Sequence, residues 1–113
     1  MNKVEAIIRP ERVTAVKDSL AEAGFVGLNI TQVVGRGVQR GIVHQVRGGG
    51  TVSVDLLPKS KVEVVIREAD TERVIQIIIG SAYTGAVGDG KIFVTPVSQV
   101  VRVRTGERGE AAL

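Results

Sequence analysis

The chain has 113 residues, which leaves room for one domain with one modest hydrophobic core. Hydrophobic residues make up 43% of the sequence and aromatic residues only 3%, and the lack of cysteine excludes disulfides and thiolate metal sites. The formal net charge is +3, with the basic residues dispersed apart from a group between Arg36 and Arg47, so we expect no nucleic-acid binding.

The first third of the chain predicts a strand, a helix and a second strand. Apolar residues alternate with other side chains over residues 4–8, and this strand ends at Pro10. Apolar residues then recur at helical spacing over residues 13–23, and Gly24 ends the helix. Alternation returns over residues 26–34, which predicts a second strand.

The next segment predicts a long loop. Glycines recur between Gly35 and Gly50, and no periodic apolar face remains. Structureless stretches of this length are unusual in small domains, and they tend to be functional or mobile. We therefore interpret residues 37–56 as a protruding loop, with a merely decorative hairpin as the alternative.

The second half repeats the pattern of the first. Residues 62–66 alternate as a strand, and Asp70 is positioned to cap a helix whose apolar stripe covers residues 74–79. A further strand is expected at residues 91–95, followed by an alternating segment over residues 101–104.

This order predicts an α+β fold of the ferredoxin-like βαββαβ type, with an extra C-terminal strand and the long loop after the second strand. In such a fold the helices cover one face of an antiparallel sheet. A second apolar face would not be left in water, because large apolar patches mark interfaces. The pattern therefore favours a single domain over residues 1–113 that forms an oligomer.

The stretch from Thr84 to Lys91 predicts an anion-binding loop. It contains three glycines, which free the backbone to approach a ligand and to expose several N–H groups in one concave turn. Lys91 adds a positive charge where the next strand begins. The spacing is not that of the nucleotide-binding P-loop. A glycine-rich hairpin turn with a solvated lysine is the alternative.

Arg102 and Arg104 are a second anion-binding candidate. Two residues apart on a strand, they would lie on one face, where two guanidinium groups repel unless an anion lies between them. The alternative is a solvated edge with two ordinary surface charges. Together with Lys91 and the glycine loop, the two arginines favour a polyphosphate site.

The sequence of the glycine loop also carries a family resemblance. Thr84–Val94, read as TGxxGDGKIFV, resembles the signature of the PII signal-transduction proteins, the small trimeric regulators of nitrogen metabolism. Further similar segments follow in the family's order and cover nearly the whole chain; they are residues 6–10, 35–41, 57–59 and 101–107.

The resemblance implies a homotrimer with the sheets facing inward and with ATP or ADP bound competitively between subunits. In that family Lys91 and the loop amides would hold phosphates, Glu63 would contact the adenine amino group, and Arg102 and Arg104 would reach the nucleotide. The positions that match the family's nucleotide site are Gly27, Asn29, Gly35, Gly37, Glu63, Val65, Thr84, Gly88, Asp89, Gly90, Lys91, Arg102 and Arg104.

The resemblance also implies an effector site beside the ATP phosphates. Gln39 would ligate Mg²⁺ together with ATP and 2-oxoglutarate, and Lys59 would bind a carboxylate of that metabolite. The positions that match the effector site are Gln39, Arg40, Gly41, Lys59 and Gly88. This chain departs from many relatives in having Val38 where a cation is usual, a loop one residue longer, and no tyrosine at the loop tip.

By the same resemblance, the long loop would dock on protein targets such as an ammonium transporter, a nitrogen-metabolism enzyme or a transcription regulator. We expect no catalytic residues, no direct membrane insertion and a cytoplasmic location, because no apolar run reaches about 18 residues and no signal peptide is evident. Three alternatives remain: a nucleotide sensor without a 2-oxoglutarate response, a small phosphohydrolase using Asp89, and a structural trimer without ligands.

Overall fold

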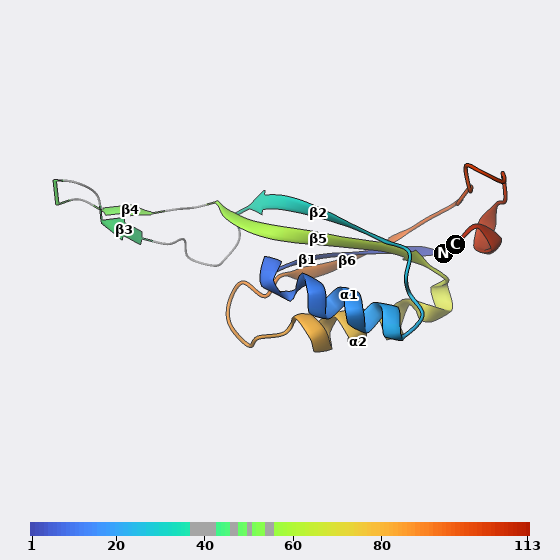
Figure 1. The fold of residues 1–113 in the computed structure, drawn as a ribbon, viewed down its shortest axis with the longest axis horizontal. Helices are drawn as coiled ribbons and strands as arrows, with labels where there is room; N and C mark the ends of the chain where they lie inside the picture. Colours follow the sequence, from blue (N-terminus) through green and yellow to red (C-terminus); the bar gives the residue numbers. More distant parts are fainter. Residues whose placement is uncertain (37–42, 46–47, 50, 54–55) are drawn as a thin grey trace.

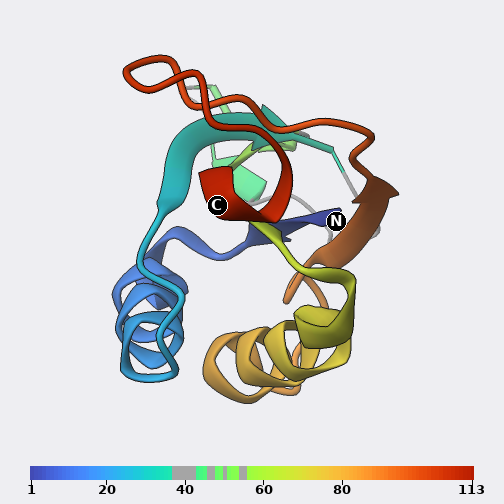
Figure 2. The same cartoon turned by 90° about the vertical axis from the view of Figure 1, so that its right-hand side faces the viewer.

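The computed structural model describes residues 1–36, 43–45, 48–49, 51–53 and 56–113. Its main sheet has four antiparallel strands in the order β2-β5-β1-β6, and two helices lie side by side on one face of it (Figures 1 and 2). This is the α+β ferredoxin-like arrangement that the sequence predicts. The strands of this sheet are β1 (Asn2–Ile8), β2 (Leu28–Gly35), β5 (Leu57–Ile66) and β6 (Lys91–Pro96).

The core lies between the sheet and the helices α1 (Val13–Glu22) and α2 (Thr71–Ala82). Alternate residues of β1 and β5 are buried on this side because successive side chains of a strand point to opposite faces. With few aromatic residues, small and branched aliphatic side chains fill the space, as the composition predicts. The buried apolar residues are Val4, Ala6, Ile8, Val16, Leu20, Val62, Val64, Ile66, Val74, Ile78 and Ala82.

Each helix begins after a short 3₁₀ turn, Pro10–Arg12 before α1 and Glu68–Asp70 before α2. Asp70 does stand at the N-cap position of α2, but its side chain makes no capping hydrogen bond. Its carboxylate instead accepts a hydrogen bond from Nε of Arg67 at 3.1 Å. The 3₁₀ turn gives Asp70 helical φ and ψ angles, whereas a capping side chain normally needs an extended backbone.

The uncovered face of the sheet is mixed and not apolar, which corrects the prediction that a second apolar face requires an oligomer. Cross-strand neighbours on this face include Glu5 opposite Glu63, and Nζ of Lys61 lies 3.5 Å from a carboxylate oxygen of Glu5. Apolar side chains such as Phe93 lie among these charges, and Phe93 is 49% exposed. Charged and apolar side chains lie next to each other on this face because neighbouring strands place different residue types directly opposite one another.

The region predicted as a long loop contains a short hairpin among its described residues. β3 (Val43–Gln45) pairs with β4 (Thr51–Ser53) beyond one end of the main sheet (Figure 1). β5 also begins earlier than predicted, at Leu57, and Pro58 is part of it, paired opposite Val34. Pro58 is exposed on this outer part of the ladder, where a strand proline is tolerated.

The expected C-terminal strand is absent from the described chain. Residues 101–104 contribute only an isolated bridge between Val101 and Arg108, and the segment closes into a turn with Gly106 at φ +72°. This segment lies at the end of the sheet opposite the β3–β4 hairpin (Figure 1). It alternates like a strand, but within one chain no neighbouring strand offers it hydrogen bonds, so it folds back on itself. Among the described residues, no helix combines the length and hydrophobicity needed to cross a membrane.

Candidate functional site

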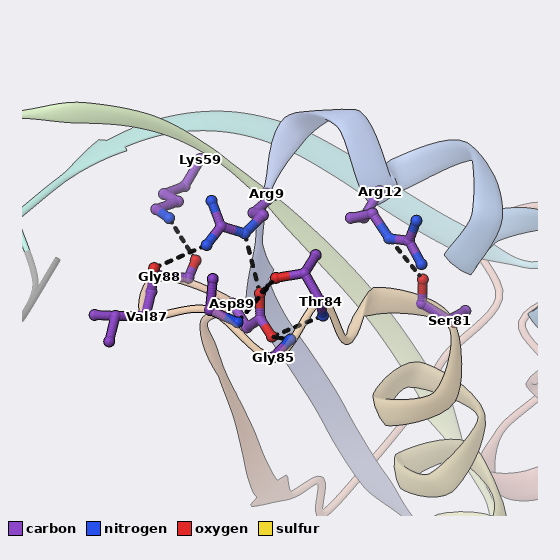
Figure 3. A network of polar contacts seen from close by, with 10 residues as sticks. Arg9, Arg12, Lys59, Ser81, Thr84, Gly85, Val87, Gly88 and Asp89 are labelled. Atoms are coloured by element: carbon purple, nitrogen blue, oxygen red, sulfur yellow. Dashed lines mark hydrogen bonds and ion pairs between the residues drawn. The ribbon is translucent and has the colours of Figure 1, made fainter. Parts of the chain in front are cut away.

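The glycine loop between α2 and β6 is organised by the carboxylate of Asp89. This carboxylate accepts hydrogen bonds from the backbone N–H of Thr84 at 2.8 Å and of Gly85 at 2.9 Å, and from the Thr84 hydroxyl. Nε of Arg9, at the end of β1, donates a further bond at 3.0 Å (Figure 3). These donors, led by the Thr84 hydroxyl, hold the pKa of Asp89 well below its ordinary value of 3.8.

Backbone geometry makes glycine necessary at the exit of this loop. Gly90 has φ +102°, and a Cβ placed there would lie 1.7 Å from the carbonyl oxygen of Ile7. Only a residue without a side chain can bring the loop so close to β1. The close approach places Lys91 directly opposite Ile7 at the start of β6.

Two cationic side chains, Arg9 and Lys59, donate hydrogen bonds to backbone carbonyls in the middle of the loop. Nη2 of Arg9 donates to the carbonyl oxygen of Val87 at 2.8 Å, and Nζ of Lys59 donates to that of Gly88 at 2.6 Å (Figure 3). Burial, followed by the neighbouring charge of Arg9, lowers the pKa of Lys59. The loop therefore lies against two positive charges, Arg9 directly after β1 and Lys59 on β5.

These elements surround one hollow of about 510 Å³ at the end of the sheet nearest the β3–β4 hairpin. Within the described residues, the backbone N–H groups of Gly88, Asp89 and Gly90 make no hydrogen bond. Uncommitted N–H groups next to lysine and arginine side chains are suited to an anion. The hollow is lined by Ile7, Gly35, Arg36, Leu57, Lys59, Ala86, Val87, Gly88, Asp89, Gly90, Lys91 and Phe93.

The structure brings together, around one hollow, the predicted site residues Gly35, Lys59 and the segment Gly88–Lys91. Thr84 belongs to the same loop, where it binds Asp89. Gly37, Gln39, Arg40 and Gly41, which were predicted for the nucleotide, Mg²⁺ and effector sites, lie outside the described residues.

A second group of predicted residues lies on the uncovered face of the sheet. Asn29 on β2 is directly opposite Glu63 on β5, and Val65 follows on the same face of β5. Gly27 comes just before β2. Their register places these residues farther along the strands than Lys59, which is four positions from Glu63 on the same face.

The C-terminal segment, which carries Arg102 and Arg104, lies at the opposite end of the molecule from the loop between α2 and β6 (Figure 1). Arg102 and Arg104 do not lie on a strand, so the expectation that a shared strand face aligns them is wrong. Arg102 is hydrogen-bonded within the C-terminal segment, to Glu107 at 2.8 Å, while Arg104 lies in an exposed turn. Neither arginine contributes to the hollow of its own chain.

Sequence reasoning missed the roles of Arg9 and of the Asp89 side chain. The sequence gives Arg9 only as part of a family-like segment, and its position directly before Pro10, at the end of a strand, is the available signal. Arg9 and Asp89 form an ion pair although they are far apart in the sequence, and a local sequence pattern cannot predict contacts between distant residues. Among the described residues, no cluster of histidine, aspartate or glutamate could hold a metal ion.

Comparison with known proteins identifies the family. The family model described as nitrogen regulatory protein P-II matches residues 1–107. The chain belongs to this family. It is 50% identical over 113 residues to the nitrogen regulatory protein P-II of Azospirillum brasilense, covering all of both chains.

A second relative is similar over the same length. Over 113 residues the chain is 48% identical to nitrogen regulatory protein P-II 2 of Methanothermobacter thermautotrophicus, covering all of this chain and 97% of that relative. Membership in the P-II family makes this protein a regulator of nitrogen metabolism and implies that it interacts with targets in that metabolism.

Proposed function

We propose that this P-II protein is a homotrimeric sensor that binds ATP and ADP competitively at a site shared by neighbouring subunits. One observation carries the proposal: the hollow beside Lys91 combines three uncommitted backbone N–H groups with the cations Lys59 and Arg36. This combination fits the phosphate groups of a nucleotide, which need several hydrogen-bond donors and positive charge together.

The division of the site within one chain supports sharing between subunits. The glycine loop and the arginines Arg102 and Arg104 lie at opposite ends of the sheet, so they cannot hold one nucleotide in the same chain (Figure 1). A neighbouring subunit would bring its C-terminal arginines to this chain's glycine loop. In this proposal Gly27, Asn29, Glu63 and Val65 line the base and ribose region on the uncovered face of the sheet.

The state of Asp89 argues against the phosphohydrolase alternative. A general base has to accept a proton near neutral pH, which requires a raised pKa for a carboxylate. The donors from Thr84, Gly85 and Arg9 lower the pKa of Asp89 instead. Its carboxylate shapes the loop, which suits a binding protein better than a hydrolase.

The proposal extends to an effector. Mg²⁺ would arrive with ATP, coordinated by phosphate oxygens and the side-chain oxygen of Gln39, and 2-oxoglutarate would complete the site next to Lys59. The metabolite's negative charges would otherwise repel the phosphates by several kcal/mol at about 4 Å. Ligand contacts would then fix one conformation of the long loop, which docks on a transporter, an enzyme or a transcription regulator.

Calorimetry on the purified protein tests both the nucleotide binding and the 2-oxoglutarate response of this proposal. ATP and ADP should compete for one site per chain, and 2-oxoglutarate should bind only when Mg²⁺ and ATP are both present. Lys91→Ala should weaken both nucleotides by about 1–3 kcal/mol, because a charge-assisted contact to phosphate is lost.

Lys17→Ala is the matched control, since Lys17 is an exposed lysine on α1 away from the hollow. Equal nucleotide affinity in the parent and in Lys91→Ala would contradict the site. Nucleotide binding with no 2-oxoglutarate response under any condition would reduce the function to nucleotide sensing alone.

A further inference from the structure

The C-terminal segment, residues 97–113, is folded around the side chain of Arg102. Nη1 of Arg102 lies 2.8 Å from the carboxylate of Glu107, and Nη2 donates to the carbonyl oxygens of Ala111 at 3.3 Å and Leu113 at 3.5 Å. Backbone bonds close the same turn, from Arg102 N–H to the Glu107 carbonyl and from Gly106 N–H to the Arg102 carbonyl, both at 2.8 Å. The last 3₁₀ turn, Gly109–Ala112, is thereby held against one guanidinium group.

These hydrogen bonds occupy the N–H groups of the Arg102 guanidinium that would otherwise bind a phosphate. A guanidinium binds a phosphate best through two N–H groups on one edge, in a planar fork. In Arg102 the edge formed by Nη1 and Nη2 is filled by Glu107 and the two carbonyls. The carboxylate of Glu107 also neutralises the charge that would attract a phosphate.

Arg104 provides a contrast two residues away. It lies in the exposed turn, and none of the hydrogen bonds or ion pairs between described residues involves its side chain. The two arginines that the proposed function places on the nucleotide therefore differ before any ligand arrives. The Arg104 side chain can bind an anion directly, whereas the Arg102 side chain is already paired with the carboxylate of Glu107.

We infer that Glu107 is an internal competitor of the nucleotide, so that phosphate binding to Arg102 displaces Glu107 and releases the last turn of the chain. This inference rests on the proposed nucleotide site and adds a regulatory device to it. Displacement lowers affinity by the strength of the Arg102–Glu107 pair. It also links nucleotide binding to the position of residues 109–113, at the end of the molecule opposite the β3–β4 hairpin.

The test compares ATP affinity in five full-length proteins: the parent, Glu107→Gln, Arg102→Ala, the double variant and a control. Glu107→Gln should bind ATP about two- to fivefold more tightly than the parent, because an exposed ion pair of ordinary strength no longer has to be broken. The same change in an Arg102→Ala background should have no effect on affinity. Glu110→Gln is the matched control, since it removes an equal charge from the nearby 3₁₀ turn Gly109–Ala112, and the Glu110 side chain is not bonded to Arg102.

Hydrogen exchange in the parent gives a second readout that does not depend on a variant. The amide of Leu113, bonded to the Glu110 carbonyl at 3.1 Å, should exchange several times faster when ATP is bound. Parent protein that binds no nucleotide would overturn the proposed function and this inference with it. Parent protein that binds ATP, but with Glu107→Gln unchanged or weaker and no faster exchange at Leu113, would overturn only the inference.

Discussion

At the scale of single residues, Asp89 shows how one side chain can fix the shape of a glycine-rich loop. Its carboxylate accepts hydrogen bonds from the N–H groups of Thr84 and Gly85 at the start of the loop and from Arg9, which directly follows β1. Within the part of the chain that the structure describes, the N–H groups of residues 88–90 make no hydrogen bond, which suits the proposed anion site. The glycine pattern and Lys91 predict such a site from sequence. The structural role of Asp89 could not be predicted from the sequence pattern, because its hydrogen-bond partners are backbone groups and a side chain 80 residues away.

The lowered pKa of Asp89 gives a pH-dependent prediction. A carboxyl group whose pKa is lower in the folded than in the unfolded chain stabilises the fold above the unfolded pKa, and this stabilisation is lost as the pH falls towards the folded pKa. Below about pH 4 the parent should therefore lose stability as Asp89 takes up a proton. Asp89→Asn should show a smaller drop in Tm between pH 6 and pH 3 than the parent.

Asp18→Asn is the control for this comparison, since Asp18 is an exposed carboxylate on α1 whose side chain is 64% exposed. Thermal unfolding followed by circular dichroism at the two pH values measures the difference. An identical drop in Tm for the parent and Asp89→Asn would show that the hydrogen bonds in the loop do not favour the ionised carboxylate.

At the scale of elements, the helices and the inner strands were predictable because each has a periodic apolar face that packs on the same core. The residues of β1, α1 and α2 follow the predicted ranges closely. The segment over residues 101–104 misled the prediction, since alternation alone cannot say whether a partner strand is present. The early start of β5 was hidden by Pro58, which usually marks the end of regular structure.

Substitution by alanine should change the stability of the protein in opposite directions at Gly90, in the loop before β6, and at Gly80, in α2. Gly90→Ala should destabilise the protein by at least about 2 kcal/mol, because left-handed backbone costs about 1–2 kcal/mol for a residue with a Cβ and the new methyl group would also strike the Ile7 carbonyl. Gly80→Ala, inside α2 with open space around it, should stabilise by about 0.5–1 kcal/mol. Urea unfolding of both variants measures the signs, and a tolerated Gly90→Ala would contradict the close approach of the loop to β1.

At the scale of the whole molecule, the predicted oligomer needs a different physical basis from the one that the sequence suggested. The uncovered face carries charged residues such as Glu5, Lys61 and Glu63 next to Phe93, so apolar burial alone does not require a partner. The stronger reason is the division of the proposed site. In the proposed function, Lys91 and the glycine loop hold the nucleotide from one subunit, and Arg102 and Arg104 reach it from the neighbour.

Mixed oligomers of two variants test this shared site most directly. Lys91→Ala and Arg104→Ala each remove one half of the proposed nucleotide site, and each alone should bind ATP weakly. When the two are unfolded together and refolded as a mixture, about one site in four should regain parental affinity, because random assembly pairs an intact Lys91 with a neighbour's intact Arg104. Calorimetry counts the tight sites, and refolded unmixed variants are the controls. No tight site in the mixture, with parental protein refolding to full binding, would contradict a site shared between subunits.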